Sequence, residues 1–177
     1  MATAPNMPTG SGHVAIAIGV AMSIGVGSAA LLVTGCASRE KTQVNTLIAD
    51  LTVARAQAMK QGMAVVTCAS SDGATCSDSN SWQRGWIVCL DAKNSNRCDA
   101  GDPVYRVQKA FVGSDSFTAS GDTSSIQFNR EGFSIGLAGT VTITLHDASG
   151  SRKAMRCVQV SAVGTIRPQK AGQGDCQ

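Results

Sequence analysis

The chain has little charge, few aromatic side chains and almost no histidine. Charged residues make up 15% and aromatic residues 4% of its 177 residues, and only two residues are histidines. With 15 basic and 12 acidic residues the net charge is +3, which excludes a strongly basic nucleic-acid-binding protein as a description of the whole chain. Any contact with DNA therefore requires a local cluster of cations. The apolar fraction of 43% is sufficient for a folded core and excludes disorder throughout.

No C-x-x-C motif occurs, although the chain has 7 cysteines. Only His13 and His146 are available to complete a ligand set, so we expect no metal site. The six cysteines after residue 60 fall into local pairs, which suit disulfides in loops or hairpins. Sequence alone allows many connectivities, and we favour Cys68/Cys76, Cys89/Cys98 and Cys157/Cys176. Because disulfides persist in oxidising compartments, we expect the periplasm or the cell exterior.

One long apolar run is present near the N-terminus. Residues 14–33 contain no charged side chain. As a helix rising about 1.5 Å per residue, a run of this length spans roughly 30 Å, the thickness of the bilayer core. We therefore expect a leader at 1–12 and a transmembrane helix at 13–36. A signal-peptide core and a buried helix are the alternatives, and the run is long for either.

Residues 37–62 have the pattern of an amphipathic helix. Apolar side chains recur at steps of three and four at Val44, Leu47, Ile48, Leu51, Ala54 and Ala58. Gly62 is well placed to end the helix. We expect this segment to continue the membrane helix and to pack its apolar stripe on a globular partner.

The pattern changes to short strands after residue 62. Strand-like runs occupy residues 63–68, 85–90, 104–108, 125–128, 141–145 and 157–161, with turns rich in Gly, Asp and Ser between them. We therefore predict an α+β fold. One long N-terminal helix is laid on an antiparallel sheet, which forms the head at 63–177.

Residues 42–168 resemble the GspH/FimT/FimU family of type IV minor pilins and type II secretion pseudopilins. The motifs that carry the resemblance are Ala54-Arg55 to Gly62, Trp82–Asp91, Phe128–Gly132 and Gly164. The resemblance implies a pilin-like fold and a structural, tip-assembly subunit of a pseudopilus or pilus, with no enzymatic activity and no cofactor. It implies other pilin or pseudopilin subunits and the inner-membrane assembly platform as partners. It also implies a single-pass inner-membrane protein with its head in the periplasm.

The resemblance also implies processing between Gly12 and His13, followed by methylation of the new N-terminus. The family has a glutamate at the fifth position after cleavage, where this chain has Ala17. Basic residues follow the apolar run at Arg39 and Lys41 and none precedes it, which is opposite to the positive-inside rule for a periplasmic head. The cysteines outweigh these two charges, so we place the head outside the cytoplasm.

A different anchor is possible at Cys36. The segment Leu32-Val33-Thr34-Gly35-Cys36 resembles a bacterial lipobox, in which the cysteine is lipidated. The alternative function is therefore a lipid-anchored periplasmic binding protein with a pilin-like head. Cys36 as a buried free cysteine is the third interpretation.

The tail from residue 151 onward is the most basic segment. It resembles the tail of FimT-type pilins that take up DNA, which carry a G-R-x-R motif where this chain has G-T-I-R at 164–167. We expect Arg152, Arg167 and Lys170 to contact phosphates, which would give weak, salt-sensitive DNA binding. The alternative is an ordinary solvated basic edge.

The pattern G-x-S-x-G at 132–136 is shared with the nucleophile elbow of hydrolases, which needs a strand, a sharp turn and a helix. Here a glycine-rich stretch and another strand-like run follow it. His146 also precedes Asp147, whereas the hydrolase triad has the acid before the histidine. We therefore expect a turn here and no catalytic residue.

Overall fold

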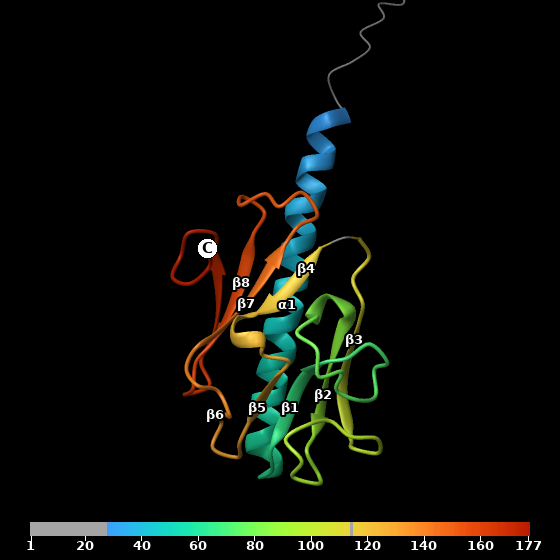
Figure 1. Cartoon of the computed structure of the whole chain (residues 1–177), viewed down its shortest axis with the longest axis vertical. Coiled ribbons are helices and arrows are strands. Elements are labelled where there is room, and N and C mark those ends of the chain that lie inside the picture. The colour runs from blue at the N-terminus through green and yellow to red at the C-terminus, as the bar shows by residue number, and fades with distance from the viewer. Residues whose placement is uncertain (1–27, 114) are drawn as a thin grey trace, which may run out of the picture.

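The computed structural model describes residues 28–113 and 115–177, with side chains from residue 39 onward. A single long helix, α1 (Ser28–Gln61), runs along the head and projects beyond it at its N-terminal end (Figure 1). The leader and most of the predicted transmembrane segment lie outside the described residues. Within the part that is described, no helix combines the length and the apolar character needed to cross a membrane.

The predicted amphipathic stripe is the buried face of α1. Val44, Leu47, Leu51, Ala54 and Ala58 are all buried in the main core, as their spacing predicts. The helix ends where Gly62 turns the chain, because the backbone there has φ +66°, which a residue with a Cβ adopts only at a cost. The Gly62 amide still donates to the carbonyl of Ala58 at 3.0 Å, so the last turn is closed.

The head contains two antiparallel sheets, where the sequence pattern had predicted one. The five-stranded sheet has the order β3 (Val104–Lys109), β2 (Gly85–Leu90), β1 (Val65–Ala69), β5 (Ser125–Phe128) and β6 (Ser134–Ile135). The four-stranded sheet has the order β4 (Ser116–Ala119), β7 (Val141–His146), β8 (Arg156–Val160) and β9 (Ile166–Lys170). Two short 3₁₀ turns, η1 (Trp82–Arg84) and η2 (Ser120–Asp122), complete the head. All six predicted strands are present, within two residues at each end.

Both sheets pack on α1, so one main core lies between the helix and the two sheets. The core joins helix residues such as Leu51 to Trp86 of the first sheet and Val158 of the second. Trp86 makes edge-to-face contacts with Phe111 and Phe117, at centroid distances of 5.5 and 6.1 Å. The few aromatic residues of this chain are therefore concentrated where the helix and the sheets meet.

The five-stranded sheet has a second, smaller core on its outer face. Every residue of β1 is buried, which an antiparallel strand with one solvated face would not show. The outer face is covered by a cluster of Val66, Ile87 and the cysteines Cys68, Cys76, Cys89 and Cys98. The continuous apolar runs at β1 and β2 thus reflect two covered faces.

Candidate functional site

Two of the predicted sites lie near the N-terminus. The processing pair Gly12 and His13 lies outside the described residues. Cys36 lies within α1, whose backbone is helical from Ser28 to Gln61, and its side chain is not among those described. Processing and lipidation therefore remain predictions.

Three disulfides hold the loops of the head. They join the cysteines in the local pairs favoured above, namely Cys68–Cys76, Cys89–Cys98 and Cys157–Cys176. The first two close loops over the outer face of the five-stranded sheet. The third ties the C-terminal loop to β8. Each crosslink lowers the entropy of the unfolded chain and so favours the folded head.

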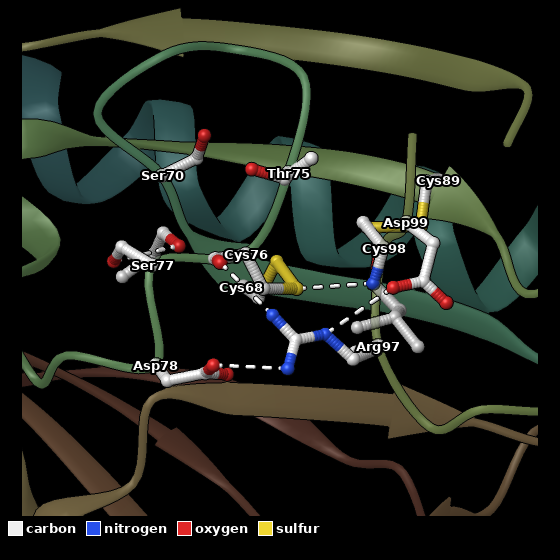
Figure 2. The surroundings of a disulfide bond; sticks show 12 residues. Cys68, Ser70, Thr75, Cys76, Ser77, Asp78, Cys89, Arg97, Cys98 and Asp99 are labelled. Atoms are coloured by element: carbon white, nitrogen blue, oxygen red, sulfur yellow. Dashed lines mark hydrogen bonds and ion pairs between the residues drawn. A yellow bond between two sulfur atoms is a disulfide. The ribbon is translucent and has the colours of Figure 1, made fainter. Parts of the chain in front are cut away.

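Figure 2 shows how Arg97 connects the first two disulfide loops. Its guanidinium lies 3.0 Å from the Asp78 carboxylate and 3.4 Å from that of Asp99, and it donates to the carbonyl of Cys76 at 3.3 Å. The amide of Cys98 approaches Sγ of Cys76 at 3.0 Å. Because the Asp78 side chain is 64% exposed, its ion pair contributes little stability, and the covalent bonds dominate.

One group of candidate metal ligands comes together within the described residues. The sulfur atoms of Cys68, Cys76 and Cys98 lie within 4.8 Å of one another. Each of them belongs to a disulfide, whereas metal coordination needs a thiolate. This group is a structural cluster in the oxidised protein.

The joint between helix and sheet contains a buried carboxylate that sequence reasoning missed. Asp50 accepts a hydrogen bond from the indole Nε1 of Trp86 at 2.9 Å, and the Arg106 guanidinium lies 3.8 Å away. Burial raises the pKa of Asp50, and the bond from Trp86 and the charge of Arg106 oppose that rise. An acidic residue beside the apolar stripe of α1 was the available signal.

A second buried carboxylate, Glu40, lies on α1 closer to its N-terminal end than Asp50. It has no exposed surface, and neither of its oxygens has a hydrogen-bond partner. Nearby, Arg39 donates to Asp115 at 2.8 Å and Gln43 donates to the same carboxylate at 3.4 Å. Burial is the main cause of the raised pKa of Glu40, and repulsion by Asp147 and then Asp115 adds to it.

The serine of the G-x-S-x-G pattern has a structural role. Ser134 is buried in β6, and its hydroxyl donates to the carbonyl of Ser161 at 2.6 Å. β6 leads through a loop into β7, which is not the strand–turn–helix geometry of a nucleophile elbow. The bond instead connects the two sheets.

The three basic residues expected to contact DNA do not lie together. Arg152 and Lys170 line one hollow, whereas Arg167 lines a separate one with Gln159 and Thr165. Side chains alternate between the two faces of a strand, so Arg167 and Lys170, three residues apart on β9, project from opposite faces. The sequence places these cations near one another along the chain, and the strand separates them.

A larger group of cations surrounds Lys170. The turn between β7 and β8, the end of β9 and the C-terminal loop border an open, shallow hollow of about 440 Å³, and a neighbouring one of about 270 Å³ reaches α1. The two share Arg156 and Lys170. We call them together the basic hollow, whose cations are Lys41, Arg152, Lys153, Arg156 and Lys170. Sequence analysis missed the contribution of Lys41, which comes from far away in the chain.

Comparison with known proteins agrees with this architecture. The family model "Type II transport protein GspH" matches residues 43–164. Two crystal structures of the type IV minor pilin FimU from Pseudomonas aeruginosa match with TM-scores of 0.62 and 0.59, both at 18% identity. They cover 77% and 75% of this chain, and 92% and 94% of FimU. No curated protein sequence matches the chain significantly.

The likeness to FimU shows a pilin-like fold. The matched family region contains the packed part of α1 and the strands from β1 to β8. The resemblance noted in the sequence is thus confirmed at the level of the family. This chain belongs to the GspH family of minor pilins and pseudopilins.

Proposed function

We propose that this chain is an assembly subunit of a type II secretion pseudopilus or a type IV pilus, anchored in the inner membrane with its head in the periplasm. The observation that carries the proposal is the shape of α1. Its N-terminal turns project beyond both sheets, and the uncharged residues 14–33 lead into that free end (Figure 1). A helix end that projects beyond its own head and follows an apolar sequence suits a bilayer or the helical centre of a filament.

The disulfides support the proposal that the head lies in the periplasm. All six of these cysteines are buried and crosslinked, which requires an oxidising space during folding. The partners we propose are other pilin or pseudopilin subunits, reached through the N-terminal helix, and the assembly platform of the inner membrane. We propose that the head lies at or near the filament tip, where its disulfide-bonded loops are exposed to other subunits.

The test is intact-mass and N-terminal peptide analysis of the protein from native membranes. A methylated start at His13 is expected for a processed pilin subunit. An unprocessed start at Met1 would contradict incorporation into a filament.

The same measurement tests the alternative anchor. A lipid-modified start at Cys36 would replace the filament proposal with a lipid-anchored periplasmic binding protein that has a pilin-like head. The two anchors cannot coexist on one molecule, because each defines a different N-terminus.

DNA binding by the tail is a second candidate, supported by the exposed position of Arg167. Arg167 lies on the face of β9 opposite to Lys170, which lines the hollow that reaches α1, and beside the hollow lined by Gln159 and Thr165. Because Arg152 and Lys170 lie on another face, a duplex held at Arg167 would meet about one phosphate-binding cation. The logarithm of the binding constant should then fall with the logarithm of salt concentration with a slope of about −0.9, against about −2.7 for three contacts. Filter retention of duplex DNA by Arg167→Ala and by the unaltered chain measures this slope, and equal retention would contradict a role for Arg167.

A further inference from the structure

We propose that, while the subunit is anchored in the membrane and before it enters a filament, the basic hollow binds phosphate groups of anionic phospholipids and so holds the head against the bilayer. This inference rests on the membrane anchoring proposed above. The ligand is a phosphodiester headgroup in the leaflet from which α1 emerges.

Within the part of the chain that the structure describes, the cations of the basic hollow form no direct ion pair. None of the ion pairs found within residues 39–113 and 115–177 includes Lys41, Arg152, Lys153, Arg156 or Lys170. The guanidinium of Arg156 donates to the backbone carbonyls of Lys153 and Met155, which orients it without neutralising it. Cations that line one hollow without direct ion pairs repel each other, and an anion would relieve that repulsion.

The chemistry of the hollow suits phosphate. Guanidinium groups bind phosphate oxygens through paired N–H bonds, and ammonium groups add compact charge. The wall between the cations contains Ala171 and Gly172, which leave room for a headgroup. Glu40 is the neighbouring carboxylate: the charge of Arg156 acts to lower the pKa of Glu40, but the two groups form no ion pair in the described structure.

The hollow lies at the end of the head from which α1 projects. The turn between β7 and β8 and the C-terminal loop both lie toward that end (Figure 1). From residue 33, where the apolar run ends, the continuous helix rises about 12 Å to Lys41. The headgroup layer extends about 5–7 Å beyond the hydrocarbon core, and surface charge acts over a further ~10 Å at 0.1 M salt. Lys41 is therefore within electrostatic reach of the headgroups.

Position favours a membrane over a nucleic acid as the source of the phosphate. A membrane crossed by the projecting end of α1 would face the hollow, because the hollow lies toward that end of the head (Figure 1). Arg167, the other basic residue of β9, is on the opposite face.

The experiment uses the full chain reconstituted in vesicles. Hydrogen exchange of the peptide covering residues 147–156 is measured in phosphatidylcholine vesicles and in vesicles with phosphatidylglycerol, at low and high salt. We expect about tenfold slower exchange in the anionic vesicles at low salt, since each surface cation gains a favourable interaction with an anionic leaflet. The difference should disappear at high salt.

Two charge-removal variants sharpen the test. Arg152→Gln/Lys153→Gln removes two exposed cations of the hollow that make no side-chain hydrogen bond in the described structure. Lys60→Gln/Lys93→Gln removes the same charge elsewhere, at the end of α1 and in the loop after β2. The first variant should lose the slow exchange, and the second should keep it.

Each contrary outcome has a distinct meaning. Flotation of the vesicles in a density gradient reports whether the protein is anchored. If the protein floats with both kinds of vesicle but hydrogen exchange of residues 147–156 is the same in both, the hollow does not bind lipid and the anchoring proposal stands. If the protein floats with neither, anchoring fails and this inference fails with it. If inorganic phosphate or a DNA duplex slows exchange equally in phosphatidylcholine vesicles, the site belongs to a soluble phosphate or a nucleic acid, and the lipid assignment is overturned.

Discussion

Gly132 and Gly164 allow their loops to lie close to each other and to the C-terminal half of α1. Arg55 Nε donates to the carbonyl of Gly132 at 2.8 Å, and Gly164 lies against the same carbonyl. A Cβ on Gly164 would collide with that oxygen, and its φ of +77° is unfavourable for other residues. The sequence singled out Gly164 by resemblance, and the structure supplies the steric reason.

Gly164→Ala should therefore lower the free energy of unfolding by about 2–5 kcal/mol, the sum of a left-handed backbone and a steric clash. The control is Gly150→Ala, with φ +66° and open space around it, which should cost only about 1–2 kcal/mol. Urea unfolding followed by the fluorescence of Trp82 and Trp86 measures both. Equal losses would contradict the steric argument.

Glu40 should make stability depend on pH. Because its folded pKa is raised, the folded state holds this proton to a higher pH than the unfolded chain does, and stability falls as pH rises above the ordinary glutamate range. Glu40→Gln should stabilise the protein by about 1–3 kcal/mol at pH 7, since it removes a buried charge whose oxygens have no hydrogen-bond partner. The gain should vanish near pH 3.5, where the carboxyl is neutral in both states.

Thermal unfolding at the two pH values checks this. The matched control is Glu131→Gln, in which an exposed carboxylate paired with Arg130 at 2.6 Å is neutralised. The pKa of Glu131 is lowered, chiefly by the hydrogen bond from Arg130, so its removal should bring no gain at pH 7. A stabilising effect of both variants would point to net charge as the cause.

At the scale of elements, sequence patterns predicted the features that depend on neighbouring residues, namely the helix and most of the strands. The apolar stripe on α1 and the six strand-like runs are both present in the structure. Each could be predicted because burial of one or both faces of an element leaves a regular pattern of apolar residues in the sequence. β6 has only two residues and β9 contains Pro168, so neither segment has the sequence pattern of a strand. Pro168 is tolerated because β9 is an edge strand of its sheet. The division into two sheets depends on which strands pair across the chain, which no local pattern records.

The functional residues also divide into those that local sequence spacing predicts and those that only distant contacts bring together. The cysteine pairs are close in sequence, so local spacing identified them. The basic hollow joins α1 to the tail, and the buried bond from Trp86 to Asp50 joins strand to helix. Both depend on contacts between distant segments, and sequence analysis therefore missed Lys41 and Asp50.

The third disulfide controls one element, the C-terminal loop. Cys157→Ala/Cys176→Ala should lower the free energy of unfolding by about 3 kcal/mol, as expected for a crosslinked loop of this size. It should also release the tail, so that trypsin cleaves after Lys170 in the folded protein. Mass spectrometry of the digest detects the product. In Cys89→Ala/Cys98→Ala the tail remains tied, and rapid cleavage after Lys170 there would contradict the assignment.

At the scale of the whole molecule, the disulfides are protected by the fold. Cys76 is 7% exposed and the other five crosslinked cysteines are 0% exposed. A reductant needs access to a sulfur atom, so reduction should require opening of the head. With a water-soluble phosphine and iodoacetamide, mass analysis should show little alkylation of these six cysteines in buffer and complete alkylation in guanidinium chloride. Fast labelling in buffer would show that the loops open independently of the core.

The placement of the chain end has a practical consequence for imaging this protein in cells. Gln177 follows Cys176, which is tied to β8, and the C-terminal loop lies toward the end where α1 leaves the head (Figure 1). A fluorescent protein fused there would crowd the base of the subunit. The loop after β2 lies at the other end, because the Asp91 amide bonds to Ala64 just beyond the end of α1. Its exposed residues 92–96 offer the better position for an epitope tag, which would lie at the end of the head opposite to the projecting end of α1.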